Sequence, residues 1–162
     1  HNVLKIFDND AAAPAELQAF ADKIIDFSSF MVNVLKVSPE AFKGTAKKVA
    51  YHSPCHLCRG LQVAEEPRKL IEFAGFEYVR SKDEDVCCGF GGSYSVDFPE
   101  VSSEILKKKL DNIEETDAQL LVTDCPGCVL QIRGGQDKRG GKLEVKHIAE
   151  ILSEVSKKVT SQ

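Results

Sequence analysis

The chain has 162 residues, of which 43% are hydrophobic and 28% charged, as in an ordinary globular protein. This length suits one domain with a substantial core. The net charge is −4 and no basic stripe is present, which argues against nucleic acid as a partner. No run of about eighteen apolar residues occurs, which excludes a transmembrane helix. The chain opens on His1 rather than Met, so its start carries no targeting information.

The N-terminal segment, residues 1–44, is predicted to be helical. Pro14 stands where a helix can begin, and apolar residues follow at helical spacing: Leu17, Phe20, Ala21, Ile24, Phe27, Met31, Val34 and Leu35. Asp26 or Ser28 is expected to cap a second helix. We interpret the segment as an amphipathic face packed on residues 45–162, with which it forms one globular unit.

Strands and helices are predicted to alternate after residue 44. Strand patterns cover residues 48–52, 76–79 and 120–123, and helical patterns cover 67–74, a segment from Pro99 and 126–132. Residues 145–159 fit the end of a strand followed by a helix. This order favours an α/β fold with a small parallel sheet covered by helices.

Details of the two later helices are also predicted. Along the helix from Pro99, five apolar residues are expected to face inward: Val101, Ile105, Leu106, Leu110 and Ile113. Residues 107–109 are all lysine and are expected to form the exposed face. Four glycines after residue 132 are interpreted as turns: Gly134, Gly135, Gly140 and Gly141.

The six cysteines are the most informative residues. Cys55 is separated by thirty-one residues from the adjacent pair Cys87 and Cys88, and a further thirty-six residues lead to Cys125 and Cys128. Cys55 and Cys125 each follow a predicted strand, so both are expected at the carboxyl edge of the sheet, where ligands gather. Without a signal peptide, such cysteines indicate metal or redox chemistry more than a disulfide framework.

The spacing of these thiols suits a polynuclear metal centre. Cys125 and Cys128 offer two sulfurs from one turn, at the expected start of a helix. Adjacent side chains diverge, so Cys87 and Cys88 reach two irons more easily than one small ion. Three glycines after Cys88 let backbone amides approach cluster sulfur closely: Gly89, Gly91 and Gly92.

Three segments carry a resemblance to a known family: residues 51–56 (YHSPCH), 87–96 (CCGFGGSYSV) and 145–150 (VKHIAE). Over residues 51–152 the chain resembles the cysteine-rich CCG domain, which occurs in the catalytic subunit of heterodisulfide reductase and in the iron–sulfur subunits of glycolate oxidase and lactate-utilisation oxidoreductases. It is most similar to the second, C-terminal repeat of the lactate-utilisation branch. Because members carry two repeats, the chain is expected to be part of a longer subunit.

The resemblance implies a non-cubane [4Fe–4S] cluster held by five thiolates: Cys55, Cys87, Cys88, Cys125 and Cys128. It implies electron transfer in an oxidoreductase that oxidises lactate or glycolate or reduces a heterodisulfide. Other subunits, carrying flavin or further iron–sulfur centres, are the implied partners. We expect a cytoplasmic protein, associated with a membrane only through those subunits. Cys58 departs from the motif and is a spare ligand, a resolving thiol or a small buried side chain.

Two alternatives remain open. One is a structural zinc site of four thiolates, from Cys55, one of the adjacent pair, Cys125 and Cys128, with zinc also able to replace a lost cluster. The other is a metal-free thiol–disulfide switch at Cys125 and Cys128. His52 and His56 flank Cys55; a structural role is expected for both, and hydrogen bonding to a ligand, proton transfer and direct metal binding remain open. Packing or capping is expected for His147. Arg59 and Arg133 either offset the charge of a cluster or face solvent.

Overall fold

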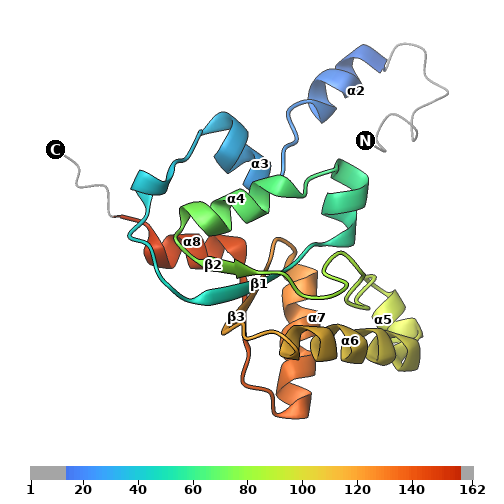
Figure 1. The fold of residues 1–162 in the computed structure, drawn as a ribbon. Helices are drawn as coiled ribbons and strands as arrows, with labels where there is room; N and C mark the ends of the chain where they lie inside the picture. The colour runs from blue at the N-terminus through green and yellow to red at the C-terminus, as the bar shows by residue number, and fades with distance from the viewer. Residues whose placement is uncertain (1–13, 158–162) are drawn as a thin grey trace.

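The computed structural model describes residues 14–157. Its centre is a sheet of four parallel strands in the order β2-β1-β3-β4 (Figure 1). In chain order the strands are β1 (Lys48–His52), β2 (Glu77–Val79), β3 (Leu120–Thr123) and β4 (Glu144–His147). The predicted α/β class, with a small parallel sheet covered by helices, is therefore confirmed.

Helices cover both faces of the sheet because successive strand residues point to opposite sides. Val49 and Val122 face α4 (Glu65–Phe73) and α8 (Ile148–Val155), in a core completed by Leu70, Ile71, Ile148, Ile151 and Leu152. Ala50 and Leu121 face α6 (Pro99–Glu114) and α7 (Pro126–Arg139), in a second core completed by Leu110, Ile113, Ile132 and Val145. The sheet is thus buried on both sides, as parallel sheets require.

The N-terminal part of the described chain consists of short helical pieces: α2 (Pro14–Ala21), α3 (Phe27–Ser29), the π-helical turn η1 (Phe30–Val34) and the 3-10 turn η2 (Pro39–Ala41). Asp26 caps α3, as predicted: its Oδ1 accepts the Ser29 N–H at 2.9 Å. Met31 packs on the core. The prediction that this segment packs through one continuous apolar face is wrong, however. The α2 helix projects from the body (Figure 1). Five of the apolar residues predicted to form the face are exposed: Phe20, Ile24, Phe27, Val34 and Leu35.

The α7 helix is longer than predicted and passes through Gly134 and Gly135, which were interpreted as turns. A Cβ on Gly135 would lie 2.6 Å from Leu106 Cδ2 and 3.0 Å from Leu110 Cδ1. The glycine therefore permits α7 to approach α6 closely. Gly140, with φ of 66°, ends the helix in the left-handed conformation.

The α6 helix begins at Pro99 as predicted, and Leu110 and Ile113 are buried. Val101 is 49% exposed, so its inward assignment is wrong. None of the helices within residues 14–157 combines the length and apolar character needed to cross a membrane.

Candidate metal centre

Two of the predicted ligands lie beyond the carboxyl ends of neighbouring strands. β1 pairs with β3 so that His52 stands opposite Thr123. Cys55 follows β1 by three residues and precedes the π-helical segment η3 (His56–Leu61), while Cys125 follows β3 and is the N-cap of α7. The expected placement of both thiols at one sheet edge is therefore observed.

A buried sulfur pair forms the centre of the site. The Sγ atoms of Cys88 and Cys128 are 3.4 Å apart, and both side chains are almost inaccessible to solvent. An imidazole nitrogen of His52 joins them, since the three potential ligand atoms all lie within 4.8 Å of one another. The loop after residue 86 and the first turn of α7 thus meet against the end of β1.

Mutual electrostatic effects link all five predicted thiols. The hydrogen bond with Cys128, and then the His52 imidazole, lowers the pKa of Cys88. Contact with Cys88, burial and the Cys125 thiol raise the pKa of Cys128. Burial first, and then the sulfurs of Cys87 and Cys88, raise the pKa of Cys55. All six thiols of the chain are free. Such crowding of thiols is the arrangement that a bound cation would stabilise.

One of the three predicted glycines supplies an amide to this group. The Gly89 N–H donates to Cys87 Sγ at 3.3 Å. Gly89 has φ of 88°, and a Cβ there would come within 2.5 Å of the Ser102 carbonyl oxygen, so a larger residue would not fit. Gly91 and Gly92 are exposed and turn the chain toward α5 (Tyr94–Asp97).

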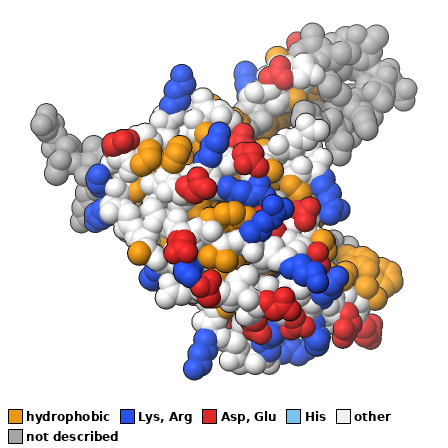
Figure 2. Space-filling model, in the orientation of Figure 1, with side chains coloured by type: hydrophobic (Ala, Val, Ile, Leu, Met, Phe, Trp, Pro, Cys, Tyr) orange, Lys and Arg blue, Asp and Glu red, His pale blue; other side chains and the backbone are white. Residues whose placement is uncertain are grey.

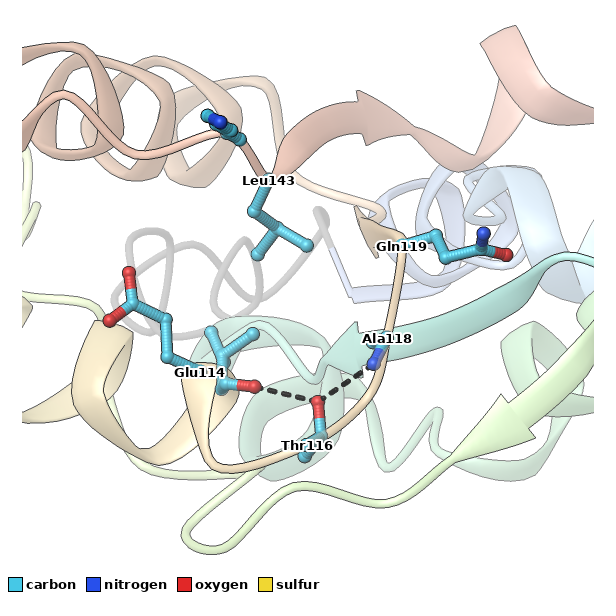
Figure 3. A pocket seen from close by; sticks show the side chains of 7 residues that line it. Glu114, Thr116, Ala118, Gln119 and Leu143 are labelled. Carbon is cyan, nitrogen blue, oxygen red and sulfur yellow. Dashed lines mark hydrogen bonds between the residues drawn. The ribbon is translucent and has the colours of Figure 1, made fainter.

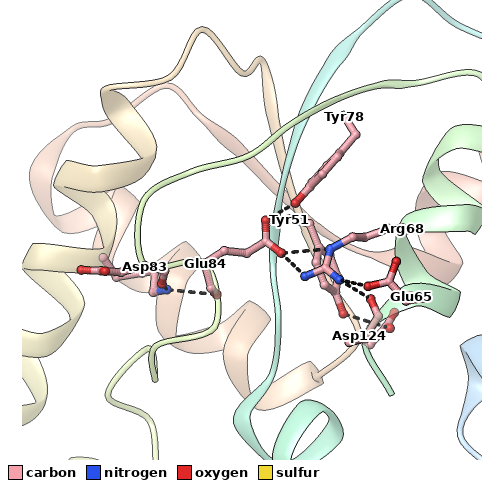
Figure 4. Close-up of polar contacts among 9 residues, drawn as sticks. Tyr51, Glu65, Arg68, Tyr78, Asp83, Glu84 and Asp124 are labelled. Atoms are coloured by element: carbon pink, nitrogen blue, oxygen red, sulfur yellow. Dashed lines mark hydrogen bonds and ion pairs between the residues drawn. The ribbon is translucent and has the colours of Figure 1, made fainter. Parts of the chain in front are cut away.

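A buried ion pair anchors the segment that leads into Cys87. Glu84 is 2% exposed and accepts hydrogen bonds from Arg68 of α4, with Nη2 at 2.7 Å, and from the Tyr78 hydroxyl (Figure 4). The Glu84 carbonyl oxygen also accepts the Ser53 N–H at 3.2 Å, which ties the segment to the end of β1. Burial and then Glu84 raise the pKa of Tyr78 to about 12.

Asp124, beside Cys125, lies in a second polar group. Its Oδ2 accepts hydrogen bonds from Ser28 Oγ at 3.0 Å and Tyr51 Oη at 3.3 Å (Figure 4). The other oxygen, Oδ1, is buried and has no hydrogen-bond partner within the described part of the chain. Burial raises the pKa of Asp124 to about 6.

Lys109 is a buried cation that the sequence interpretation missed. The side chain was expected on an exposed face, yet it is only 2% exposed, and its Nζ donates to the carbonyl oxygens of Asp83 and Glu84, the latter at 3.2 Å. Burial lowers the pKa of Lys109, and the nearby Cys88 opposes that shift. A signal was available, because Lys109 lies four residues from both Ile105 and Ile113, on the inward face of α6.

The remaining predicted residues have local roles. Cys58 is half-buried, and its thiol lies 3.7 Å from the Cys55 carbonyl oxygen. His147 caps α8, as foreseen, with Nδ1 accepting the Ala149 N–H at 3.2 Å. His56 is exposed. Arg59 and Arg133 donate to backbone carbonyl oxygens, those of Asp85 and Val145.

A surface cavity whose lining includes Phe90 and Ser102 lies beside the loop that follows Cys88. Another, of about 330 Å³, is lined by Glu114, Thr116, Gln119 and Leu143 and opens at the amino ends of β3 and β4 (Figure 3). It is therefore at the edge of the sheet opposite to the cysteines. Figure 2 shows acidic and basic side chains interspersed, with an apolar group over α5, and agrees with the absence of a basic stripe in the sequence.

Comparisons with known proteins agree with this arrangement of cysteines. The profile of the family described as "Cysteine-rich domain", CCG, matches residues 49–133. Lactate utilization protein A of Lysinibacillus sphaericus is 36% identical over 150 residues, which cover 92% of this chain and 65% of the relative. The protein of the same name from Bacillus velezensis is 37% identical over 150 residues, covering 91% of this chain and 62% of the relative. The chain thus spans less than two thirds of the length of these relatives. It belongs to the family of cysteine-rich CCG domains.

Proposed function

We propose that this chain is an iron–sulfur electron-transfer domain of an oxidoreductase that oxidises lactate. The proposed ligands are Cys55, Cys87, Cys88, Cys125 and Cys128. The observation that carries the proposal is the buried Cys88–Cys128 pair, whose Sγ atoms are 3.4 Å apart, at the sheet edge where Cys55 and Cys125 follow β1 and β3. Thiolates are the ligands that iron–sulfur clusters use.

The residues at the site fit such a cofactor. Two buried sulfurs provide the protected interior, and the more accessible Cys55, Cys87 and Cys125 provide further ligands at its rim. Both nitrogens of the buried His52 lack hydrogen-bond partners among the described residues, which is unusual for so polar a side chain. A bound group beside Cys88 would give the imidazole a partner.

The cluster, when bound, would supply one-electron transfer; the protein controls its environment. The apolar side chains of Leu110, Ile113 and Ile132 belong to the core that contains Cys88 and Cys128, and they exclude water from that side. Lys109 supplies a positive charge near Cys88. The Gly89 amide donates to Cys87. The positive charge and the donated amide favour the negatively charged thiolates and the reduced state, whereas the apolar surroundings oppose both.

The substrate and the partners are part of the proposal. Similarity to proteins named Lactate utilization protein A supports a role in lactate oxidation rather than the oxidation of glycolate or the reduction of a heterodisulfide. Since the chain covers less than two thirds of those relatives, we infer that the domain works with further domains or subunits that carry flavin or other iron–sulfur centres.

Anaerobic reconstitution with ferrous iron and sulfide tests the proposal. The wild-type chain should bind about four iron and four sulfide ions, as the implied [4Fe–4S] cluster requires. Cys87→Ala and Cys88→Ala should each lose the cluster, because the adjacent thiols diverge toward different irons. Cys58→Ala, the matched control, should retain it. Retention of a full cluster by either Cys87→Ala or Cys88→Ala would contradict the five-thiolate centre.

A structural zinc site is the second candidate, and one observation favours it. His52, Cys88 and Cys128 offer three ligand atoms within 4.8 Å of one another, as a single ion requires. A colourless protein with one zinc per chain after anaerobic isolation, and no uptake of iron, would establish this candidate in place of the cluster.

A further inference from the structure

His52 is an isolated polar side chain in a closed environment. It is the last residue of β1, is 1% exposed, and neither Nδ1 nor Nε2 has a hydrogen-bond partner among residues 14–157. A neutral imidazole carries one N–H donor and one acceptor, and a buried donor without an acceptor is destabilising. A group bound at the site would provide the acceptor that His52 lacks among these residues.

Two potential acceptors near His52 are sulfur atoms. One of its nitrogens lies within 4.8 Å of both Cys88 Sγ and Cys128 Sγ. The buried Lys109 side chain is a second donor near Cys88, but its Nζ already donates to the carbonyl oxygens of Asp83 and Glu84. A metal-bound thiolate keeps lone pairs on sulfur that accept hydrogen bonds. The Cys88 sulfur is almost inaccessible to solvent, so a donor for it has to come from the protein.

We infer that His52 is a positioning residue that donates an N–H hydrogen bond to the metal-bound sulfur of Cys88 and so raises the reduction potential of the centre. The inference rests on the proposed iron–sulfur function and extends it to a residue outside the five thiolates.

The expected consequence is a shift in the redox equilibrium. Reduction adds negative charge to the cluster and its sulfurs, so a donated N–H stabilises the reduced state more than the oxidised state. We expect removal of the donor to favour the oxidised form about tenfold, which for one electron corresponds to a potential about 59 mV lower. Ligation by His52 would instead remove iron from the site when the imidazole is lost.

The experiment measures iron content and reduction potential in the reconstituted chain. His52→Leu removes the donor, while His52→Gln and His52→Asn place an amide N–H near the positions of Nε2 and Nδ1. His56→Leu is the matched control, because His56 stands on the other side of Cys55 and its side chain is exposed. Folding of each variant is checked by far-UV circular dichroism. If His52→Leu does not fold, His52→Met replaces it.

We expect wild-type iron content and the lower potential in His52→Leu, recovery of at least half of the shift in one amide variant, and no change in His56→Leu. An unchanged potential in a folded, loaded His52→Leu protein would overturn the inference. The inference would also be overturned if the His52→Leu variant lost its iron and the wild type showed ¹⁴N hyperfine coupling of the strength expected for a directly bound nitrogen. Those two results would identify His52 as a metal ligand. Failure of the wild type to take up iron and sulfide would instead overturn the proposed function itself.

Discussion

The ring of Phe90 lies against the backbone of Gly127: a Cβ at position 127 would come within 2.6 Å of Phe90 Cε1 and 2.8 Å of Cδ1. Gly127 stands between Cys125 and Cys128, and Phe90 follows Cys88 by two residues. The two cysteine loops are therefore packed together through residues that carry no sulfur. Ser102 of α6 holds the first loop from its other side, because its hydroxyl donates to the Gly89 carbonyl oxygen at 2.8 Å.

This contact predicts that Gly127→Ala separates the loops. The added methyl group must displace the Phe90 ring, and overpacking of this kind costs about 1–3 kcal/mol. We expect a corresponding fall in the free energy of unfolding, measured in urea, and at least a halving of the iron bound on reconstitution. Gly134→Ala, in the same helix but with nothing within 4 Å of its added Cβ, should keep wild-type iron uptake. Equal behaviour of the two variants would refute the packing argument.

Lys109→Met should destabilise the fold and lower the reduction potential of the metal centre. The substitution leaves the carbonyl oxygens of Asp83 and Glu84 without their buried donor, which costs about 1–3 kcal/mol. It also removes the positive charge near Cys88, so the reduction potential should fall. Lys107→Met on the exposed face of the same helix should change stability by less than about 0.5 kcal/mol. Urea unfolding and redox titration of both variants check the prediction.

The raised pKa of Asp124 predicts that stability falls as the pH rises. The pKa moves from 3.8 to about 6 on folding, so the folded state binds the proton more tightly than the unfolded state. This contribution is fully present below pH 4 and is lost as the pH passes 6; it amounts to at most about 3 kcal/mol. Asp124→Asn mimics the protonated form and should lack this fall.

The measurement is the free energy of unfolding in urea at pH 4, 5, 6 and 7, on metal-free protein with reductant. Subtracting the Asp124→Asn curve from the wild-type curve removes the contributions of all other groups. Asp85→Asn, at an exposed carboxyl two residues before Cys87, should follow the wild-type curve. Parallel wild-type and Asp124→Asn curves would show that Asp124 ionises in the folded protein without cost.

Mild oxidation of the metal-free chain should join Cys88 to Cys128. With diamide as oxidant, the two thiols give up two electrons and two protons and form one S–S bond. Their sulfurs are 3.4 Å apart and need to approach to only about 2.05 Å. Peptide mapping by mass spectrometry identifies the bond. A product dominated by Cys125–Cys128 would instead support the thiol–disulfide switch that the Cys-x-x-Cys spacing suggests.

Local sequence patterns sufficed for the four strands, for the starts of α6 and α7, and for the edge of the sheet that carries the cysteines. The apolar run of β3 and the helix start at Pro126 are local features, and parallel strands bring their carboxyl ends to one edge. Cys55 and Cys125 could thus be assigned to one edge of the sheet from the sequence alone. The capping of α8 by His147 was foreseen for the same reason, since a cap depends on its immediate neighbours.

Only the tertiary structure decided which side chains meet across that edge. The burial of His52 beside Cys88, the inward position of Lys109 and the contact of Phe90 with Gly127 join segments far apart in the sequence. The passage of α7 through Gly135 depends likewise on the close approach of Leu106 from α6. Helical periodicity and turn propensity describe one segment at a time, whereas these features depend on how two segments pack, because packing fixes the space and the partners that each side chain receives.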